Sequence, residues 1–175
     1  NTALSLGIHH LWRKKAIALL KKNNPKSILD VATGTADFAI EAMHLNPGKV
    51  TGLDISVEML EVGKRKIEKK NLQNIIQLQQ GDSENLPFGE NSFDAVTVGF
   101  GVRNFEDLEK GLSNIYRVLK PGGTIAILEF SQPTKFPIKQ LYNFYFTKIC
   151  PVMGRVFSKD FSAYSYLHES VAAFP

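Results

Sequence analysis

The chain has 175 residues, of which 43% are hydrophobic and 22% charged, and its formal net charge is +4. This size suits a single domain, and this composition excludes a disordered or fibrous protein. One cysteine, Cys150, excludes a disulfide framework and a multi-cysteine zinc site, and no metal is expected. No apolar run approaches the ~20 residues that span a bilayer, and the first residues do not resemble a signal peptide. A cytoplasmic protein is therefore expected.

Helical and apolar segments alternate along the chain. In chain order we expect a helix over 8–22, a strand over 27–31, a helix over 37–45, a strand over 50–54, a helix from the N-cap Ser56 to about residue 70, strands over 74–79 and 93–98, an amphipathic helix over 108–119 and a strand over 124–130. The strand segments are continuously apolar, which is typical of strands covered by helices on both faces. This order predicts an α/β fold with a doubly wound, Rossmann-like sheet of five parallel strands flanked by helices. Ligands bind outside the carboxyl ends of such strands, so the segments that follow them are candidate site segments.

The segment after the first strand contains the run Gly34, Thr35, Ala36 and Asp37. A turn of small residues lets backbone N–H groups approach a ligand closely. A dinucleotide turn needs G-x-G-x-x-G, and the glycine that makes room for a pyrophosphate is missing here. The acidic Asp37 near that place favours a ligand with a cationic or zwitterionic group. An ordinary strand-to-helix turn is the alternative.

Asp54 ends the second strand, 20 residues after Gly34. An acidic residue at this place accepts hydrogen bonds from both hydroxyls of a ribose. The alternative is that Asp54 only helps to cap the helix that begins near Ser56. Because Asp54 comes with the glycine turn at the expected spacing, we favour the ribose role.

A polar loop that includes Asp82 and Ser83 follows the third strand. A carboxylate or backbone group here is placed to reach an adenine amino group, and Leu86 and Phe88 are placed to wall the ring. A solvated loop before Pro87 is the alternative.

Two glycines and the pair Arg103 and Asn104 follow the fourth strand. A guanidinium at a strand end is suited to binding an oxyanion. The alternative is a plain ion pair of Arg103 with Glu106 or Asp107.

Together, these motifs and the Pro-Gly-Gly before the fifth strand resemble class I S-adenosylmethionine (SAM)-dependent methyltransferases. A narrower resemblance is to the ubiquinone/menaquinone-biosynthesis C-methyltransferase family, and it covers essentially the whole chain. The runs that carry it are 4–13, 81–88, 91–94, 100–104, 116–123, 128–133 and 164–170. The run around Arg103 and Asn104 is specific to this family, whereas the SAM motifs are shared by many.

The resemblance implies that SAM is the cofactor. It implies that the residues that bind SAM are Gly34, Thr35, Asp54, Asp82 and Ser83. The implied reaction is methyl transfer to a ring carbon of a demethylated prenylated quinol, such as demethylmenaquinol in menaquinone biosynthesis. The equivalent step of ubiquinone biosynthesis and methylation of another small molecule are alternatives.

Within this resemblance, Arg103 and Asn104 are the candidate catalytic residues, because they are placed to hold the quinol oxygen. The general base stays open among His168, Tyr166 and a water on Arg103.

Two positions depart from many family members. Ala36 stands where many have glycine, and Gly99 stands where some have a serine that touches SAM. Both variants look closer to the menaquinone-type members. We expect the Ala36 methyl to crowd the cofactor slightly.

We expect one domain over 1–175, with an N-terminal helical segment 1–25, a SAM-binding core 26–130 and a substrate-side helical segment 131–175. Eleven of the 18 aromatic residues lie in the last 46 residues. An aromatic, basic helix over 135–149 would shield a prenyl chain and touch a membrane surface peripherally, at the inner face of the cytoplasmic membrane. Class I sheets have seven strands, and strands 6 and 7 are not expected within these 175 residues. This chain is therefore expected to be part of a longer one. A homodimer is left open.

Three other functions are alternatives to quinol methylation. A nucleic-acid methyltransferase is disfavoured by the segment 99–102 and by the modest charge, so no nucleic-acid partner is expected. A nicotinamide-dependent dehydrogenase is disfavoured by the single-glycine turn. A SAM-binding scaffold of the quinone pathway, without turnover, is the non-enzymatic alternative.

Overall fold

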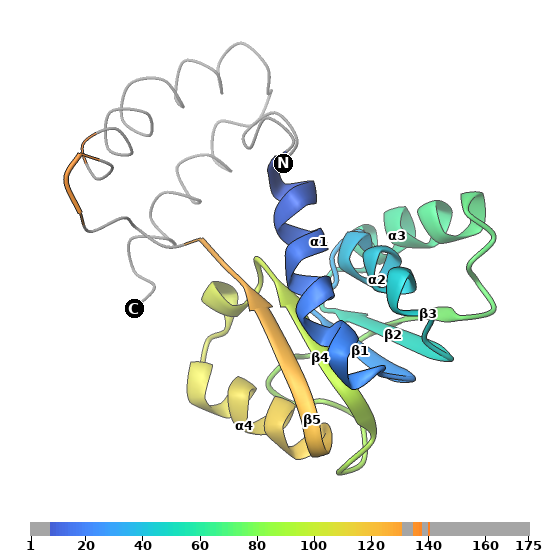
Figure 1. The fold of residues 1–175 in the computed structure, drawn as a ribbon. Coiled ribbons are helices and arrows are strands. Elements are labelled where there is room, and N and C mark those ends of the chain that lie inside the picture. The colour runs from blue at the N-terminus through green and yellow to red at the C-terminus, as the bar shows by residue number, and fades with distance from the viewer. Residues whose placement is uncertain (1–7, 131–134, 138–139, 141–175) are drawn as a thin grey trace. The chain divides into compact units, whose positions relative to one another are not determined.

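A computed structural model of the chain describes residues 8–130, 135–137 and 140 (Figure 1). The chain divides into two compact units, one of His10–Glu129 and one of Asn1–His9 with Phe130–Pro175. The sheet and the candidate site belong to the first unit. The expected single domain in three segments stays a prediction, and nearly all of its segment 131–175 lies outside the described residues.

The described elements alternate as the sequence predicts. They are α1 (Ile8–Leu20), the 3-10 turn η1 (Lys21–Asn23), β1 (Ser27–Val31), α2 (Asp37–Glu41), η2 (Ala42–Leu45), β2 (Lys49–Asp54), α3 (Val57–Lys69), β3 (Ile76–Gln80), β4 (Phe93–Gly99), η3 (Val102–Asn104), α4 (Leu108–Val118) and β5 (Leu119–Leu128). The sheet order is β3-β2-β1-β4-β5, and every neighbouring pair is parallel (Figure 1). The predicted five-stranded α/β sheet with flanking helices is confirmed.

The last strand differs most from its prediction. Leu119 already pairs with Phe93, and the register then shifts so that Thr124 pairs with Ala95. Residues 120–123 therefore form an irregularity inside β5, where Gly122 has a φ of 77°. The Pro-Gly-Gly run does not separate α4 from the strand as expected, because α4 ends at Val118 and β5 begins at once.

The first helical turns follow the local signals. Ser56 is the N-cap of α3, and its hydroxyl accepts the Met59 N–H at 3.3 Å, as its position before the helix predicts. The helix expected over 37–45 is α-helical only as far as Glu41 and continues as the 3-10 turn η2.

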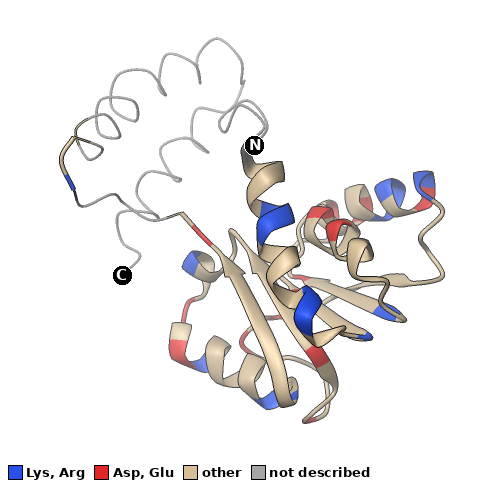
Figure 2. Ribbon diagram, viewed as in Figure 1, with Lys and Arg blue, Asp and Glu red and all other residues tan. Residues whose placement is uncertain are grey.

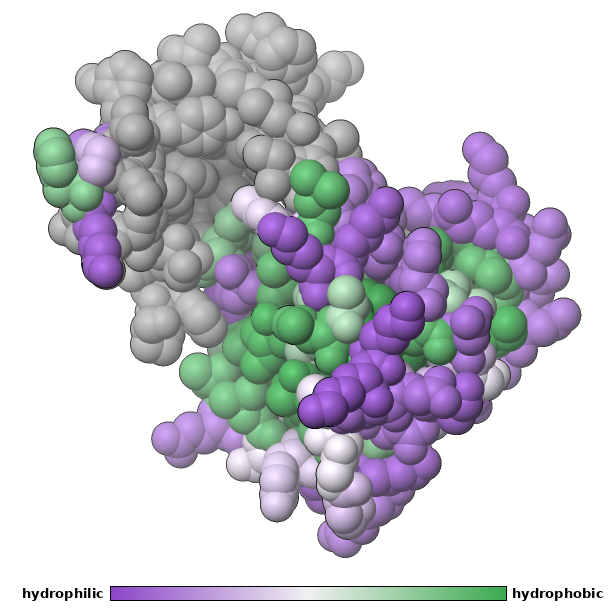
Figure 3. Space-filling view, viewed as in Figure 1, coloured by the Kyte–Doolittle hydropathy of each residue, from purple (hydrophilic) through white to green (hydrophobic). Residues whose placement is uncertain are grey.

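The apolar core lies along the central strands. Ile28, Leu29 and Val31 of β1 and Val96 and Val98 of β4 are completely buried. Charged residues lie mainly on helices and loops (Figure 2), and apolar residues form a continuous patch bordered by hydrophilic side chains on the face shown in Figure 3. Within the described ranges, no helix is long and apolar enough to cross a membrane.

Candidate active site at the carboxyl ends of the strands

The loop after β1 has an unusual backbone. Ala32, Gly34 and Ala36 have φ angles of 53°, 56° and 62°, all in the left-handed region. Glycine adopts this region readily, whereas another residue there costs roughly 1–2 kcal/mol. The surrounding contacts must therefore hold the loop in this conformation.

A buried carboxyl group, Asp30 of β1, provides the first of these contacts. Its Oδ2 accepts the Thr33 hydroxyl at 2.5 Å and the Ala39 N–H at 3.1 Å, and its Oδ1 accepts the Thr97 hydroxyl at 2.6 Å. Burial raises its pKa to about 6, although these hydrogen bonds act in the opposite direction. Asp30 thus ties the loop after β1 to α2 and β4. Sequence analysis did not single it out, and the available signal was an acid inside an apolar strand segment.

Asp54, at the end of β2, provides the second contact. Its Oδ2 accepts the Gly34 N–H at 2.7 Å and its Oδ1 accepts the Ser56 N–H at 2.9 Å. The structure therefore brings together Gly34 and Asp54, which the sequence predicts to share a site. It also gives Asp54 the local bond to Ser56 that the capping alternative expects. A carboxylate has about four lone-pair sites, so both oxygens keep acceptor capacity for hydroxyl groups.

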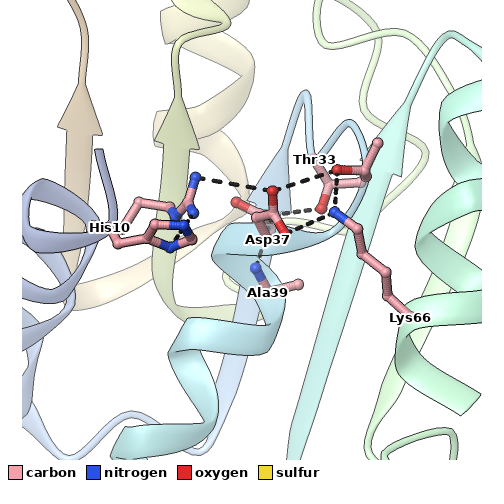
Figure 4. Close-up of polar contacts among 8 residues, drawn as sticks. His10, Thr33, Asp37, Ala39 and Lys66 are labelled. Atoms are coloured by element: carbon pink, nitrogen blue, oxygen red, sulfur yellow. Dashed lines mark hydrogen bonds and ion pairs between the residues drawn. The ribbon is translucent and has the colours of Figure 1, made fainter. Parts of the chain in front are cut away.

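Thr35 and Asp37 are held by basic side chains from other elements (Figure 4). The Lys66 ammonium donates to Thr35 Oγ1 at 2.7 Å and to Asp37 Oδ1 at 2.8 Å. On the other side, Arg13 Nη1 lies 3.9 Å from Asp37 Oδ2. Sequence analysis assigned neither base to the site, because each is brought there by a helix distant in the chain.

The two departures from the family pattern have a structural explanation. Ala36 is completely buried, and a Cβ built on Gly63 of α3 would lie 3.2 Å from its methyl group. The buried methyl faces α3, which argues against the expected crowding of the cofactor by Ala36, and that expectation stays a prediction. A Cβ on Gly99 would lie 2.3 Å from the ring of Phe38, so Phe38 fills the space that a serine would need.

The loop after β3 is anchored to the start of α4. Asp82 Oδ1 accepts the Glu84 N–H at 2.8 Å, and Ser83, between them, is half-buried. The buried Glu84 carboxylate accepts the N–H groups of Glu106 at 2.6 Å and Asp107 at 2.9 Å. Glu84 is therefore anchored rather than solvated, whereas Asp82 is exposed, and the adenine role of this loop stays a prediction.

The two apolar residues expected beside an adenine lie differently. Arg117 of α4 donates to the carbonyl oxygens of Leu86 at 2.9 Å and Phe88 at 2.7 Å. Phe88 packs edge-on against Phe93, with 5.0 Å between ring centroids. Phe93 begins β4, so Phe88 lies near the amino end of that strand, away from the carboxyl ends where the donor is expected. The predicted place of Phe88 at the adenine is therefore wrong.

Arg103 and Asn104 lie in η3, directly after β4. The Arg103 guanidinium forms an ion pair with Glu129 and donates to the Phe100 carbonyl at 2.9 Å, and the Arg103 N–H donates to Glu129 at 3.3 Å. The Arg103 and Glu129 side chains are 10% and 6% exposed. Arg103 thus forms an ion pair, as the alternative to an oxyanion role expects, but its partner is Glu129 and not Glu106 or Asp107. The sequence prediction missed Glu129, although an acid at the carboxyl end of a strand is the same signal that marked Asp54.

The comparisons with known proteins decide the family. The model of the ubiE/COQ5 methyltransferase family matches residues 1–175. The chain belongs to this family. A demethylmenaquinone methyltransferase of Bacteroides fragilis is 52% identical over the whole chain, which spans 72% of that relative. A relative in Geotalea daltonii, a ubiquinone/menaquinone biosynthesis C-methyltransferase, is 48% identical over the whole chain, which spans 75% of it.

Solved structures agree with the fold of this ubiE/COQ5-family chain. The YcgJ protein of Bacillus subtilis has a TM-score of 0.62 and 25% identity, with 79% of this chain and 59% of that chain covered. A SAM-dependent methyltransferase of Aquifex aeolicus has a TM-score of 0.60 and 22% identity over 71% of this chain and 70% of that one. The family and the fold make the chain a SAM-dependent methyltransferase, as predicted.

Proposed function

We propose that the chain transfers a methyl group from SAM to a ring carbon of demethylmenaquinol, a demethylated prenylated quinol. The observation that carries this proposal is the similarity of the whole chain to demethylmenaquinone methyltransferases of Bacteroides fragilis and Porphyromonas gingivalis, at 52% and 49% identity. Retention of SAM motifs without turnover is the rival explanation, and a methyl-transfer assay separates the two.

The donor is bound by the loops after β1, β2 and β3. Gly34 and Thr35 face the methionyl part, Asp54 accepts the ribose hydroxyls, and Asp82 and Ser83 line the adenine. The residues present suit this ligand, because the Gly34–Asp54 hydrogen bond already fixes the ribose acceptor beside the turn.

Exposed apolar side chains support an adenine beside Asp54. Ile55, directly after Asp54, is 73% exposed, and Met59 of α3 is also exposed. The Met59 methyl group lies 3.6 Å from where a Cβ on Gly34 would be, so Met59 borders the turn. These side chains can cover an aromatic ring that stacks beside the ribose site.

Arg103 and Asn104 orient the acceptor. SAM supplies the methyl group on its sulfonium. The ring carbon next to a phenolic hydroxyl becomes nucleophilic as that hydroxyl loses or shares its proton, and negative charge then develops on the oxygen. Arg103 and Asn104 hold that oxygen, and the ion pair with Glu129 keeps the guanidinium in one place.

The deciding experiment measures transfer of a labelled methyl group from SAM to prenylated naphthoquinols and benzoquinols side by side, with a reductant present. We expect incorporation into the naphthoquinol. Equal incorporation into both, or none into either, overturns the demethylmenaquinol assignment. SAM binding without incorporation would support the scaffold instead.

A variant tests the role of Arg103 within this assay. Arg103→Lys keeps the charge but loses the planar fork, and we expect kcat to fall by about 10²–10³-fold while SAM affinity is kept. The matched control is Lys120→Gln, since Lys120 forms an exposed ion pair with Asp94 at 2.7 Å, near the start of β4. Equal kcat values for the two variants would show that Arg103 does not orient the acceptor.

We further propose peripheral membrane contact through residues 135–149, at the inner face of the cytoplasmic membrane. Most of this segment lies outside the described residues, but Lys135 and Phe136 are described, and Phe136 is 80% exposed. A basic and an aromatic residue side by side suit an anionic lipid surface. Co-sedimentation with anionic but not with neutral vesicles is the expected result.

A homodimer is a separate question, and sedimentation of the same preparation without lipid tests it.

A further inference from the structure

Two cations share one carboxylate beside the donor turn. Lys66 of α3 and Arg13 of α1 approach opposite oxygens of Asp37, at 2.8 Å and 3.9 Å (Figure 4). The cluster of Arg13, Asp37 and Lys66 therefore carries one positive charge in excess. A second anion placed there would balance it.

Arg13 is the less satisfied of the two cations. Its side chain is only 9% exposed, and its contact with Asp37 is too long for a hydrogen bond. Its Nη2 donates to His10 Nδ1 at 2.9 Å, whereas no acceptor among the described residues lies within hydrogen-bond distance of its buried Nε. A buried guanidinium is costly unless it is paired and hydrogen-bonded, so Arg13 is under-compensated by its contacts with Asp37 and His10.

The cluster borders the place assigned to the methionyl part of the donor. Lys66 also donates to Thr35 Oγ1 at 2.7 Å, and Thr35 directly follows Gly34 in the turn. The side chains of Asp37 and Lys66 are 43% and 37% exposed, so a ligand can reach them from solvent. The methionyl group is a zwitterion, and its carboxylate is the only anionic group of SAM.

We propose that Arg13 and Lys66 bind the methionyl carboxylate of SAM, while Asp37 binds the adjacent ammonium group. This inference rests on SAM as the donor. The ligand carboxylate gives Arg13 and Lys66 a second anionic acceptor, so that Asp37 no longer compensates both bases alone. The ligand ammonium faces Asp37, so each charge of the zwitterion lies next to an opposite charge. Arg13 thereby connects the N-terminal helix α1 to donor binding.

The test compares two ligands that differ only in the carboxylate. Titration calorimetry on the full chain measures the Kd of S-adenosylhomocysteine and of its decarboxylated form, S-adenosyl-3-thiopropylamine. The wild type is expected to bind the carboxylate-bearing ligand more tightly. Arg13→Gln and Lys66→Gln are each expected to weaken that ligand by about 10–100-fold, the size of a hydrogen bond to a charged group, and not to weaken the decarboxylated ligand.

Matched variants separate binding from folding. Lys14→Gln removes the exposed charge next to Arg13 and should change neither Kd. If Arg13→Gln does not fold, Lys66→Gln decides alone, because Lys66 is partly exposed. Equal weakening of both ligands, or of neither, overturns the proposal. Because these measurements need no quinol, absence of methyl transfer would refute the proposed function without touching this result.

Discussion

The loops that follow the neighbouring strands β1 and β4 are held in different ways. The loop after β1 is fixed by several polar contacts from different elements, including Asp30 of its own strand, Asp54 of β2 and Lys66 of α3. The described contacts of the loop after β4 include one buried ion pair, between Arg103 and Glu129, and the hydrogen bond from the Phe100 N–H to the Leu128 carbonyl at 2.7 Å. Both loops contain a left-handed residue that is not glycine, so both need such anchors.

This difference sets how each loop should respond to mutation. Where contacts come from several elements, the loss of one leaves the others in place. Where two buried charges compensate each other, removal of one takes a counter-charge from the other, which is far more costly. The loop proposed to orient the acceptor is therefore expected to be the more vulnerable of the two.

The largest effect is expected from Glu129→Gln. This change keeps the shape of the side chain but removes the carboxylate with which the Arg103 guanidinium, 10% exposed, forms its ion pair. Breaking a buried pair in this way costs about 3–5 kcal/mol of unfolding free energy. Urea unfolding measures the change, and methyl transfer should be lost with it.

The control for Glu129→Gln is Glu61→Gln. Glu61 forms an ion pair with Lys64 at 2.5 Å, and both side chains are about half exposed. Solvent screens such a pair, so its loss should leave stability nearly unchanged. Equal effects of the two changes would show that the Arg103–Glu129 pair is not the main anchor of its loop.

The second effect is a pH dependence that arises from Asp30. Burial raises its pKa from 3.8 to about 6, so the folded protein holds this proton more tightly than the unfolded chain. The contribution of protonated Asp30 to the unfolding free energy is complete below pH 3.8 and is lost as the pH rises through about 6. It amounts to about 3 kcal/mol, the free energy that corresponds to this shift.

The measurement is the difference in unfolding free energy between the wild type and Asp30→Asn at several pH values. Asparagine does not titrate, and the other acids cancel in the difference. Relative to the variant, the wild type should lose stability between pH 4 and pH 7. If the difference in unfolding free energy does not change with pH, the pKa of Asp30 is not raised in the folded protein.

The donor side of the site was more predictable from sequence than its supports. Gly34 and Asp54 were paired correctly because a glycine turn and an acid after the next strand must meet at one sheet edge. Glu129 was not matched to Arg103, because the sequence does not specify which acid across neighbouring strands a base will meet. Lys66 was missed because its site role depends on how α3 packs, which no local pattern encodes.

A third change tests the contact between β4 and α2, the elements that border the two loops. Gly99, at the end of β4, leaves no room for a side chain, since a Cβ there would lie 2.3 Å from the Phe38 ring of α2. We expect Gly99→Ser to destabilise the fold by about 1–3 kcal/mol through overpacking. Thermal or urea unfolding measures this loss.

The double variant Gly99→Ser with Phe38→Leu is the companion of that measurement. A smaller side chain at 38 makes room for the serine, so the double change should cost less than the sum of the two single changes. Simple additivity would mean that the ring of Phe38 does not exclude a side chain at 99, and that α2 and β4 are not coupled there.

The smallest effect is expected from Ala36→Gly in the loop after β1. Glycine removes the strain of a φ of 62°, worth roughly 1–2 kcal/mol. It also removes a buried methyl group, worth about 0.8 kcal/mol, and frees the unfolded chain, worth about 0.4–1 kcal/mol. These contributions nearly cancel, so the unfolding free energy should change by less than about 1 kcal/mol. Because the methyl faces Gly63 of α3 rather than the turn's open side, the Kd of S-adenosylhomocysteine should stay the same. Tighter binding by Ala36→Gly would show that the methyl does crowd the donor, and that this loop moves when it binds.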